Sequence, residues 1–150
     1  MAAYDGRTVV HTVRPPFHPL LWSFAGFCFV GTLLTDIAYW KTAEMQWANF
    51  SAWLVSAGVV LGVVALIVAI VDLLIGRLAG EGASIWAYTL GNLLALVLSV
   101  LNAMVHTRDG WTSVVPWGLV LSALVVLILL VTGMLSRWVG YSRGVVVSDV

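Results

Sequence analysis

The stretch LVSAGVVLGVVALIVAIVDLLIG, residues 54–76, decides the fold of this chain. It contains one ionisable side chain, Asp72, in 23 residues, and as a helix it would be about 35 Å long at ~1.5 Å per residue. The hydrocarbon core of a bilayer is about 30 Å thick, and a helix needs about 20 apolar residues to cross it. The stretch therefore predicts a membrane-spanning helix.

Small residues recur along this stretch at alternating steps of four and three: Gly58, Gly62, Ala65, Ala69, Asp72 and Gly76. Helices in lipid associate by close packing, so small residues mark the face that contacts other helices. The alternation is typical of the seam of a left-handed bundle. We therefore expect Asp72 to face the interior of a bundle.

The remaining sequence is also too apolar for a soluble domain. Its hydrophobic fraction is 61% and its charged fraction 9%, against about 45–50% and about 25% in soluble domains. The predicted spans are about 19–40, 50–78, 84–105 and 114–136. Short links make neighbouring helices antiparallel. We predict an all-α membrane protein, a left-handed antiparallel bundle of four transmembrane helices over residues 18–140, with an arm at 1–17 and a tail at 141–150.

Each of the other predicted helices has a similar stripe. The stripes are His18, Trp22, Ala25, Phe29, Thr32 and Asp36 in the first helix; Tyr88, Asn92, Ala95, Ser99, Asn102 and His106 in the third; and Gly118, Ser122, Val125, Leu129, Thr132 and Ser136 in the fourth. Because the stripes carry the polar residues of their helices, we expect them to face inward.

Loop charge predicts the orientation. The arm, the second link and the tail region hold Arg7, Arg14, Arg77, Arg137 and Arg143, whereas the other two links hold Lys41 and Arg108. Basic residues favour the cytoplasmic side, so five against two predicts that both termini are cytoplasmic. The net charge is zero and no basic face is visible, which argues against nucleic acid as a partner.

Ionisable residues inside a membrane need a partner or a function. The candidate functional cluster near the cytoplasmic side is His18, Asp72, Arg77, Asn92 and Arg143, and an outer polar cluster is Asp36, Asn102, His106 and Arg108. We expect Asp72 to contact His18, Arg77 or Arg143. The structural interpretation of Asp36 is an interfacial pair with Lys41 or Arg108.

The sequence lacks the residue patterns of several kinds of cofactor and catalytic site. A bis-histidine haem b needs two histidines at similar depth, but His18 and His106 are predicted at opposite faces, and His11 lies in a proline-flanked arm. The sequence has no clustered zinc ligands and no Walker, nucleophile-elbow or GxGxxG motif. Cys28 is the only cysteine, so no intrachain disulfide can form. We expect no enzyme activity, no metal and no catalytic residue.

Several short segments together resemble a known family. They are His18–Leu21, Thr35–Trp40, Val71–Asp72, Gly91–Asn92, Asn102, Pro116–Ser122 and Tyr141–Val145. Over about residues 17–147 the chain resembles the bacterial membrane proteins called domain of unknown function 2231 (DUF2231). The resemblance implies a four-helix inner-membrane protein without an established activity. Some relatives are joined to cytochrome c or sugar-dehydrogenase modules, which implies a link to membrane electron transfer.

The sequence departs from that family where a haem would need support. Ser23 and Ala25 stand where relatives often have histidine and proline, Arg143 stands where they often have histidine, and residues 134–137 replace a glycine-rich turn. Three hypotheses follow: a non-enzymatic subunit or partner of a larger, redox-linked membrane complex; a small transporter or proton conductor using Asp72; and a haem- or quinone-binding electron-transfer protein. The sequence assigns no ligand, partner protein or oligomeric state.

Overall fold

The structure, a computed structural model, describes residues 17–75, 82–107 and 114–143, and the side chains within 17–75, 86–107 and 114–135. This part of the chain is helical, with no strand. The elements are α1 (His18–Thr42), α2 (Met45–Leu74), α3 (Gly82–His106), a short π-helical turn η1 (Val114–Gly118) and α4 (Leu119–Arg143). The prediction of an all-α, four-helix chain is therefore confirmed.

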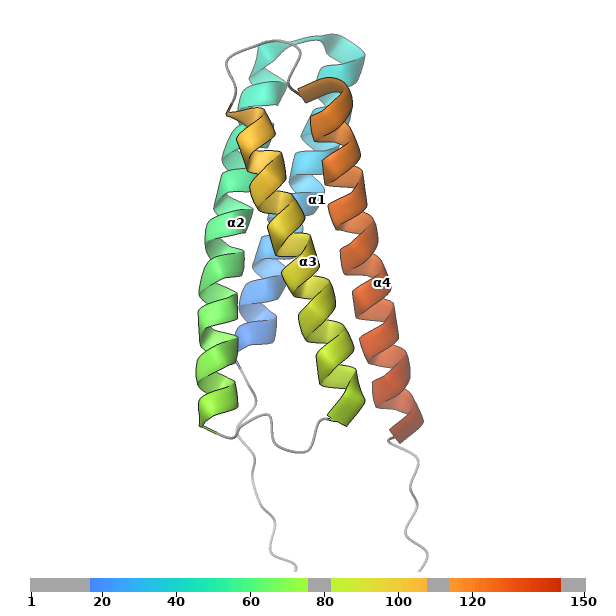
Figure 1. The fold of residues 1–150 in the computed structure, drawn as a ribbon. Coiled ribbons are helices and arrows are strands. Elements are labelled where there is room, and N and C mark those ends of the chain that lie inside the picture. The colour runs from blue at the N-terminus through green and yellow to red at the C-terminus, as the bar shows by residue number, and fades with distance from the viewer. Residues whose placement is uncertain (1–16, 76–81, 108–113, 144–150) are drawn as a thin grey trace, which may run out of the picture.

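The helices run alternately up and down (Figure 1). The start of α1, the end of α2, the start of α3 and the end of α4 all lie at one end of the bundle, which we call the terminal end. Contacts are most extensive within the pairs α1–α2 and α3–α4, and sparser where α2 meets α3 and where α1 meets α4. The bundle is therefore two helical hairpins packed against each other.

Local sequence explains where α1 begins and ends. Pro19 stands in its first turn, where a missing N–H costs nothing because that group has no partner inside the helix. Ala43 then takes a left-handed conformation, with φ of 56°, and its N–H donates to the carbonyl of Tyr39 at 2.8 Å. Only Ala43 and Glu44 separate α1 from α2. The first hairpin is consequently tight.

Two helices extend beyond the predicted spans by more than two residues. Helix α2 begins at Met45, whereas hydropathy places the span from about 50, and α4 continues to Arg143 beyond the predicted 136. Hydropathy marks where a helix meets lipid, and residues 45–49 and 137–143 are more polar without containing a helix-breaking proline. The helix α2 is described to Leu74, and the predicted end at 78 lies outside the described residues.

The described stripe residues all turn inward. Buried among them are His18, Trp22, Ala25, Phe29, Thr32, Asp36, Gly58, Gly62, Ala65, Asp72, Asn92, Ala95, Ser99, Asn102, Gly118, Ser122, Val125 and Thr132, and half-buried are Ala69, Tyr88, His106 and Leu129. Gly76 and the side chain of Ser136 lie outside the described part. The inward orientation is thus confirmed, and the left-handed sense of the bundle stays a prediction.

The outer surface of the bundle is apolar. Large side chains such as Phe27, Trp53 and Leu74 are mostly exposed, and contiguous apolar surface of this kind is rare on soluble monomers. Among the described residues, four segments are long and apolar enough to cross a membrane: His18–Thr42, Met45–Leu74, Trp86–His106 and Val114–Leu135. The chain is therefore a membrane protein with four candidate spans.

Glycine allows the helices to approach closely inside the first hairpin. A Cβ atom built on Gly58 would lie 2.5 Å from Cε1 of Phe29 and 3.1 Å from Cβ of Cys28. Such distances are too short for carbon atoms, so the hairpin can close only because this position lacks a side chain. Gly26 in α1 differs, because a Cβ atom there would meet no atom within 4 Å.

We predict that Gly58→Leu destabilises the bundle by about 1–3 kcal/mol, as overpacking of a filled interior does. Gly26→Leu is the matched control, since it adds the same side chain to open space and should leave stability unchanged or slightly raised. Thermal unfolding in mild detergent measures both. Equal melting temperatures for the two variants would contradict the close approach at Gly58.

Candidate functional site

A buried histidine–aspartate pair lies at the terminal end. His18 is the first residue of α1, Asp72 lies in the last turn of α2, and His18 Nδ1 is 3.1 Å from Asp72 Oδ2. Both side chains are almost fully buried. The contact expected between Asp72 and one of three cationic residues is thus made with His18. Arg77 and the side chain of Arg143 lie outside the described residues.

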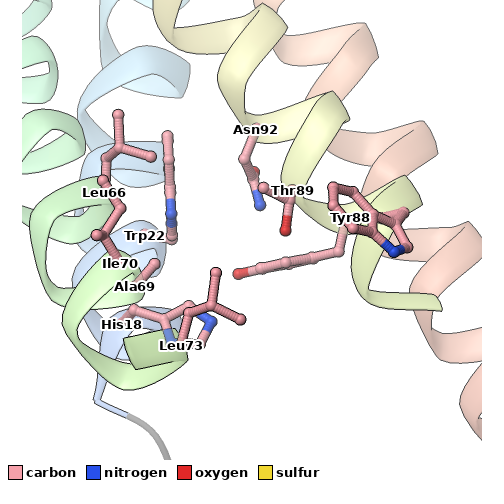
Figure 2. A pocket seen from close by; sticks show the side chains of 10 residues that line it. His18, Trp22, Leu66, Ala69, Ile70, Leu73, Tyr88, Thr89 and Asn92 are labelled. Carbon is pink, nitrogen blue, oxygen red and sulfur yellow. The ribbon is translucent and has the colours of Figure 1, made fainter. Parts of the chain in front are cut away.

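A cavity of about 140 Å³ adjoins this pair and lies between the two hairpins. Its walls come from α1 (His18 and Trp22), from α2 and from α3. In Figure 2 the hydroxyl end of Tyr88 points across the space toward α2, with His18 below it. The rings of His18 and Tyr88 have centroids 6.3 Å apart. We call this space the terminal cavity.

Asn92 lines the upper part of the terminal cavity, and its amide points into the space (Figure 2). The residue is 5% exposed, and its Nδ2 atom makes no hydrogen bond of standard geometry within the described structure, although the side chain interacts with that of Tyr88. A buried polar group without a partner costs about 1–3 kcal/mol. The sequence prediction placed Asn92 beside His18 and Asp72, and the structure brings Asn92 and His18 to the same cavity.

Sequence reasoning missed two walls of this site. Tyr88 was assigned to the inward stripe but not to the candidate cluster, although its four-residue spacing from Asn92 puts both on one face of α3. Trp22 was likewise assigned only to the inward stripe, and its indole lines both the core and the cavity. The spacing was the available signal. The cavity itself depends on how far apart the hairpins lie, which no local pattern encodes.

The second polar cluster is a ring of hydrogen bonds at the opposite end of the bundle, in which only Asn102 Oδ1 is a buried atom without a partner in the described structure. Asn102 Nδ2 donates to Ser122 Oγ at 2.8 Å, and Ser122 Oγ donates to Asp36 Oδ2 at 2.5 Å. Asp36 Oδ1 lies 2.9 Å from His106 Nε2, and His106 Nδ1 lies 2.9 Å from the carbonyl of Asn102. The ring joins α1, α3 and α4.

The ring fixes one tautomer of His106. A carbonyl oxygen can only accept, so Nδ1 of His106 carries a proton and donates it to Asn102. Between Nε2 and Asp36 there is then one proton, and the hydrogen bond is kept whichever group holds it. The side chains of His106 and Asp36 are both 0% exposed. Gly118 provides room for the imidazole, because a Cβ there would lie 2.9 Å from Cε1 of His106.

The prediction that Asp36 pairs with Lys41 at the membrane interface is wrong. Asp36 is paired with His106 inside the bundle and not with Lys41, whose Nζ lies 4.4 Å from the centre of the Trp40 ring. The reason is the stripe spacing, which turns Asp36 inward, whereas Lys41 lies on the exposed surface. Arg108 lies outside the described residues.

An apolar layer separates the two polar clusters. It consists of Trp22, Ala25, Phe29, Ala65, Ala95, Leu96 and Val125. The hydroxyls at intermediate depth bond within their own helices, Ser99 to the carbonyl of Ala95 at 2.8 Å and Thr32 to that of Cys28 at 2.9 Å. Within the described residues, no chain of side-chain hydrogen bonds connects one cluster to the other.

The two described histidines do not fit a bis-histidine haem. His18 and the Asp36 partner of His106 are 18 residues apart in α1, which corresponds to about 27 Å along a helix. The two histidines therefore lie at opposite ends of the bundle, as the sequence predicts. No group of three or more His, Cys, Asp or Glu side chains gathers in a metal-binding arrangement within the described part of the chain.

Comparison with known protein families identifies the family of this chain. The model of the family described as Predicted membrane protein (DUF2231) matches residues 14–149. The chain belongs to this family. No curated protein and no solved structure matches it. The terminal cavity and the buried ring both lie inside the region that matches DUF2231, and the family description adds a membrane location but no activity.

We predict that Ser122→Ala destabilises this DUF2231 protein by about 1–3 kcal/mol, because it removes a donor to Asp36 and leaves Asn102 Nδ2 unpaired. Ser23→Ala is the control, since Ser23 is exposed and bonds only to the carbonyl of Pro19 in its own helix. Thermal unfolding in mild detergent compares them. If the two serine variants unfold at the same temperature, the ring does not stabilise the fold.

Proposed function

We propose that this protein is a non-enzymatic membrane module that binds an apolar compound dissolved in the bilayer, in the terminal cavity. The observation that carries the proposal is the Asn92 amide, which is buried, directed into a cavity and without a hydrogen bond of standard geometry, its interaction in the described structure being with the Tyr88 side chain. In lipid an unpaired polar group is retained only if something compensates for it. A ligand that accepts a hydrogen bond from Asn92 would do so.

The walls of the terminal cavity support access from the lipid. Ile70 and Leu73 of α2 and Trp86 of α3 contribute to its lining and are exposed on the surface of the bundle. These residues lie in the candidate spans, where the surrounding solvent would be hydrocarbon. A compound could therefore enter between α2 and α3 without crossing the bundle.

The same geometry favours binding over conduction. A proton or solute path through this bundle would need polar groups across its depth, but the apolar layer around Phe29 and Ala65 lies between the two clusters. The Asp72 side chain is engaged with His18 at one end and is far from the buried ring. The proposal of a transporter using Asp72 is therefore the weaker one.

The association of this protein with a larger complex stays a prediction from the sequence. The proposed binding module would serve as a subunit or partner of a larger membrane complex, which is linked to redox chemistry only through the modules joined to some relatives. Co-purification in mild detergent tests this association directly. The absence of any stoichiometric partner at native expression levels would contradict it.

We propose further that the protein lies in the bacterial inner membrane with both termini in the cytoplasm. Basic residues number five on the side of the termini and two on the opposite side, and cytoplasmic loops are the ones enriched in such residues. Helix α1 starts and α4 ends at the same end of the bundle (Figure 1). That arrangement is the one an even number of crossings produces.

The orientation predicts reporter activities of opposite kind at two positions. A fusion after Val150 should report a cytoplasmic location, and one inserted beside Glu44, between α1 and α2, should report an external one. A phosphatase reporter, active only outside, and a fluorescent protein, active only inside, measure this. A cytoplasmic signal at Glu44 together with an external one at Val150 would reverse the orientation.

We predict that filling the terminal cavity removes its ligand. Ala69→Phe places a ring in the cavity, whereas Ala57→Phe adds the same ring to the exposed face of α2. Protein purified in mild detergent is extracted with solvent, and apolar compounds per mole of protein are quantified by mass spectrometry. The parent and Ala57→Phe should retain one compound that Ala69→Phe has lost. Identical extracts from all three proteins would refute binding in this cavity.

A further inference from the structure

The chemistry of the terminal cavity specifies a class of ligand. Resting on the proposed function, we propose that the ligand is a single-ring quinone or its quinol, carried on an apolar tail that remains in the bilayer. The argument uses the size of the cavity, the polar groups around it, the charges that line it and the side on which it opens. It concerns binding of the ring and includes no electron-transfer step.

The volume fits one six-membered ring. A cavity of about 150 Å³ in a protein interior accommodates benzene, and the terminal cavity measures about 140 Å³. A porphyrin or a multi-ring system would not fit without moving α2 away from α3. The indole of Trp22 is seen edge-on in Figure 2, so one of its faces is turned toward the space where the ring would lie.

Three polar groups around the space match the oxygens of such a ring. Asn92 Nδ2 can only donate, which suits a quinone carbonyl. The Tyr88 hydroxyl can donate to a carbonyl or accept from a quinol hydroxyl. His18 is held through Nδ1 by Asp72, which leaves its other ring nitrogen as a further donor or acceptor at the base of the cavity.

The cavity lacks what a phospholipid head group would need. Its described lining contains neither lysine nor arginine, and the nearest ionisable pair, His18 and Asp72, includes a carboxylate. Among the described lining residues, a phosphate would therefore meet no lysine or arginine, and it would lie near the carboxylate of Asp72. A neutral head group with hydrogen-bonding oxygens is the chemistry that these side chains complement.

The exposed edge of the terminal cavity leaves room for the hydrocarbon tail of the ligand. Leu73 is 60% exposed and Trp86 is 67% exposed, so the lining continues onto the outer surface of α2 and α3. A hydrocarbon tail attached to the ring could leave between them and remain in lipid. Asn92 lies about three turns into α3, at ~3.6 residues per turn, so the ring would lie inside the bundle while its tail leaves toward the start of α3.

Asn92→Leu separates a binding role from a structural one. If Asn92 serves the ligand, replacing it removes an unpaired buried amide, so the ligand-free protein should melt at the same or a higher temperature. If Asn92 is structural, the melting temperature should fall. Asn102→Leu is the matched control, because Asn102 donates to Ser122 in the buried ring and its loss should lower the melting temperature.

Binding is measured with the full chain in phosphatidylcholine nanodiscs, which supply no quinone. The probe is decyl-p-benzoquinone, and decylbenzene has the same ring and tail without oxygens. We expect saturable binding of the quinone, weakened about tenfold by Asn92→Leu through loss of one hydrogen bond. Decylbenzene should bind more weakly, and its affinity should not depend on Asn92.

Two results distinguish the inference from the proposed function. If decylbenzene binds as tightly as the quinone, or if Asn92→Leu leaves quinone affinity unchanged, the ligand class is wrong. The proposed function would still stand if Ala69→Phe, or Thr89→Phe from the α3 side, abolished binding while Ala57→Phe did not. If neither cavity variant alters binding of either compound, both the class and the site are rejected.

Discussion

The absence of water inside the bilayer is the constraint on which this structure depends. Backbone groups there must bond within their own helices, which explains why the described chain is almost entirely helical. Side chains meet the same requirement by facing one another. Polar residues appear on each helix at the spacing of a single face, and the small residues among them let the helices approach. One alternating pattern thus produces both the fold and the positions of the buried polar groups.

The two ends of the bundle satisfy that constraint to different degrees. At one end, Asp36, His106, Ser122 and Asn102 form a ring of hydrogen bonds, and only the Oδ1 atom of Asn102 has no partner within the described structure. At the terminal end, His18 and Asp72 are paired, but the amide of Asn92 is directed into an open space. Each end thus has one buried polar atom without a hydrogen-bond partner, and the two differ in that Asn92 borders a cavity whereas Asn102 does not line it, which is why the proposed function uses the terminal end.

Most of the fold was predictable from the sequence because lipid makes it depend on hydropathy and spacing alone. The inward stripes followed from steps of three and four, and so did the burial of Asp72 and Asn92. The pairing of Asp36 with His106 did not follow, although both residues were singled out, because spacing gives depth and face but not which helix lies opposite. Lys41, adjacent in sequence, was the misleading candidate. The terminal cavity arises from the separation of two hairpins, which is a property of the assembled bundle.

The proposed binding of an apolar compound would account both for the cavity between the hairpins and for an Asn92 amide that makes no hydrogen bond of standard geometry. A cavity forfeits the dispersion contacts of its lining, and an unpaired amide adds its own desolvation penalty. Both losses disappear when a compound of the right shape fills the space and accepts a hydrogen bond from Asn92. A ligand that binds only the folded protein then adds to stability by mass action. Helix α2 contacts α3 less extensively than it contacts α1. Such a compound can therefore enter between α2 and α3 without disturbing the tight α1–α2 hairpin or the buried ring.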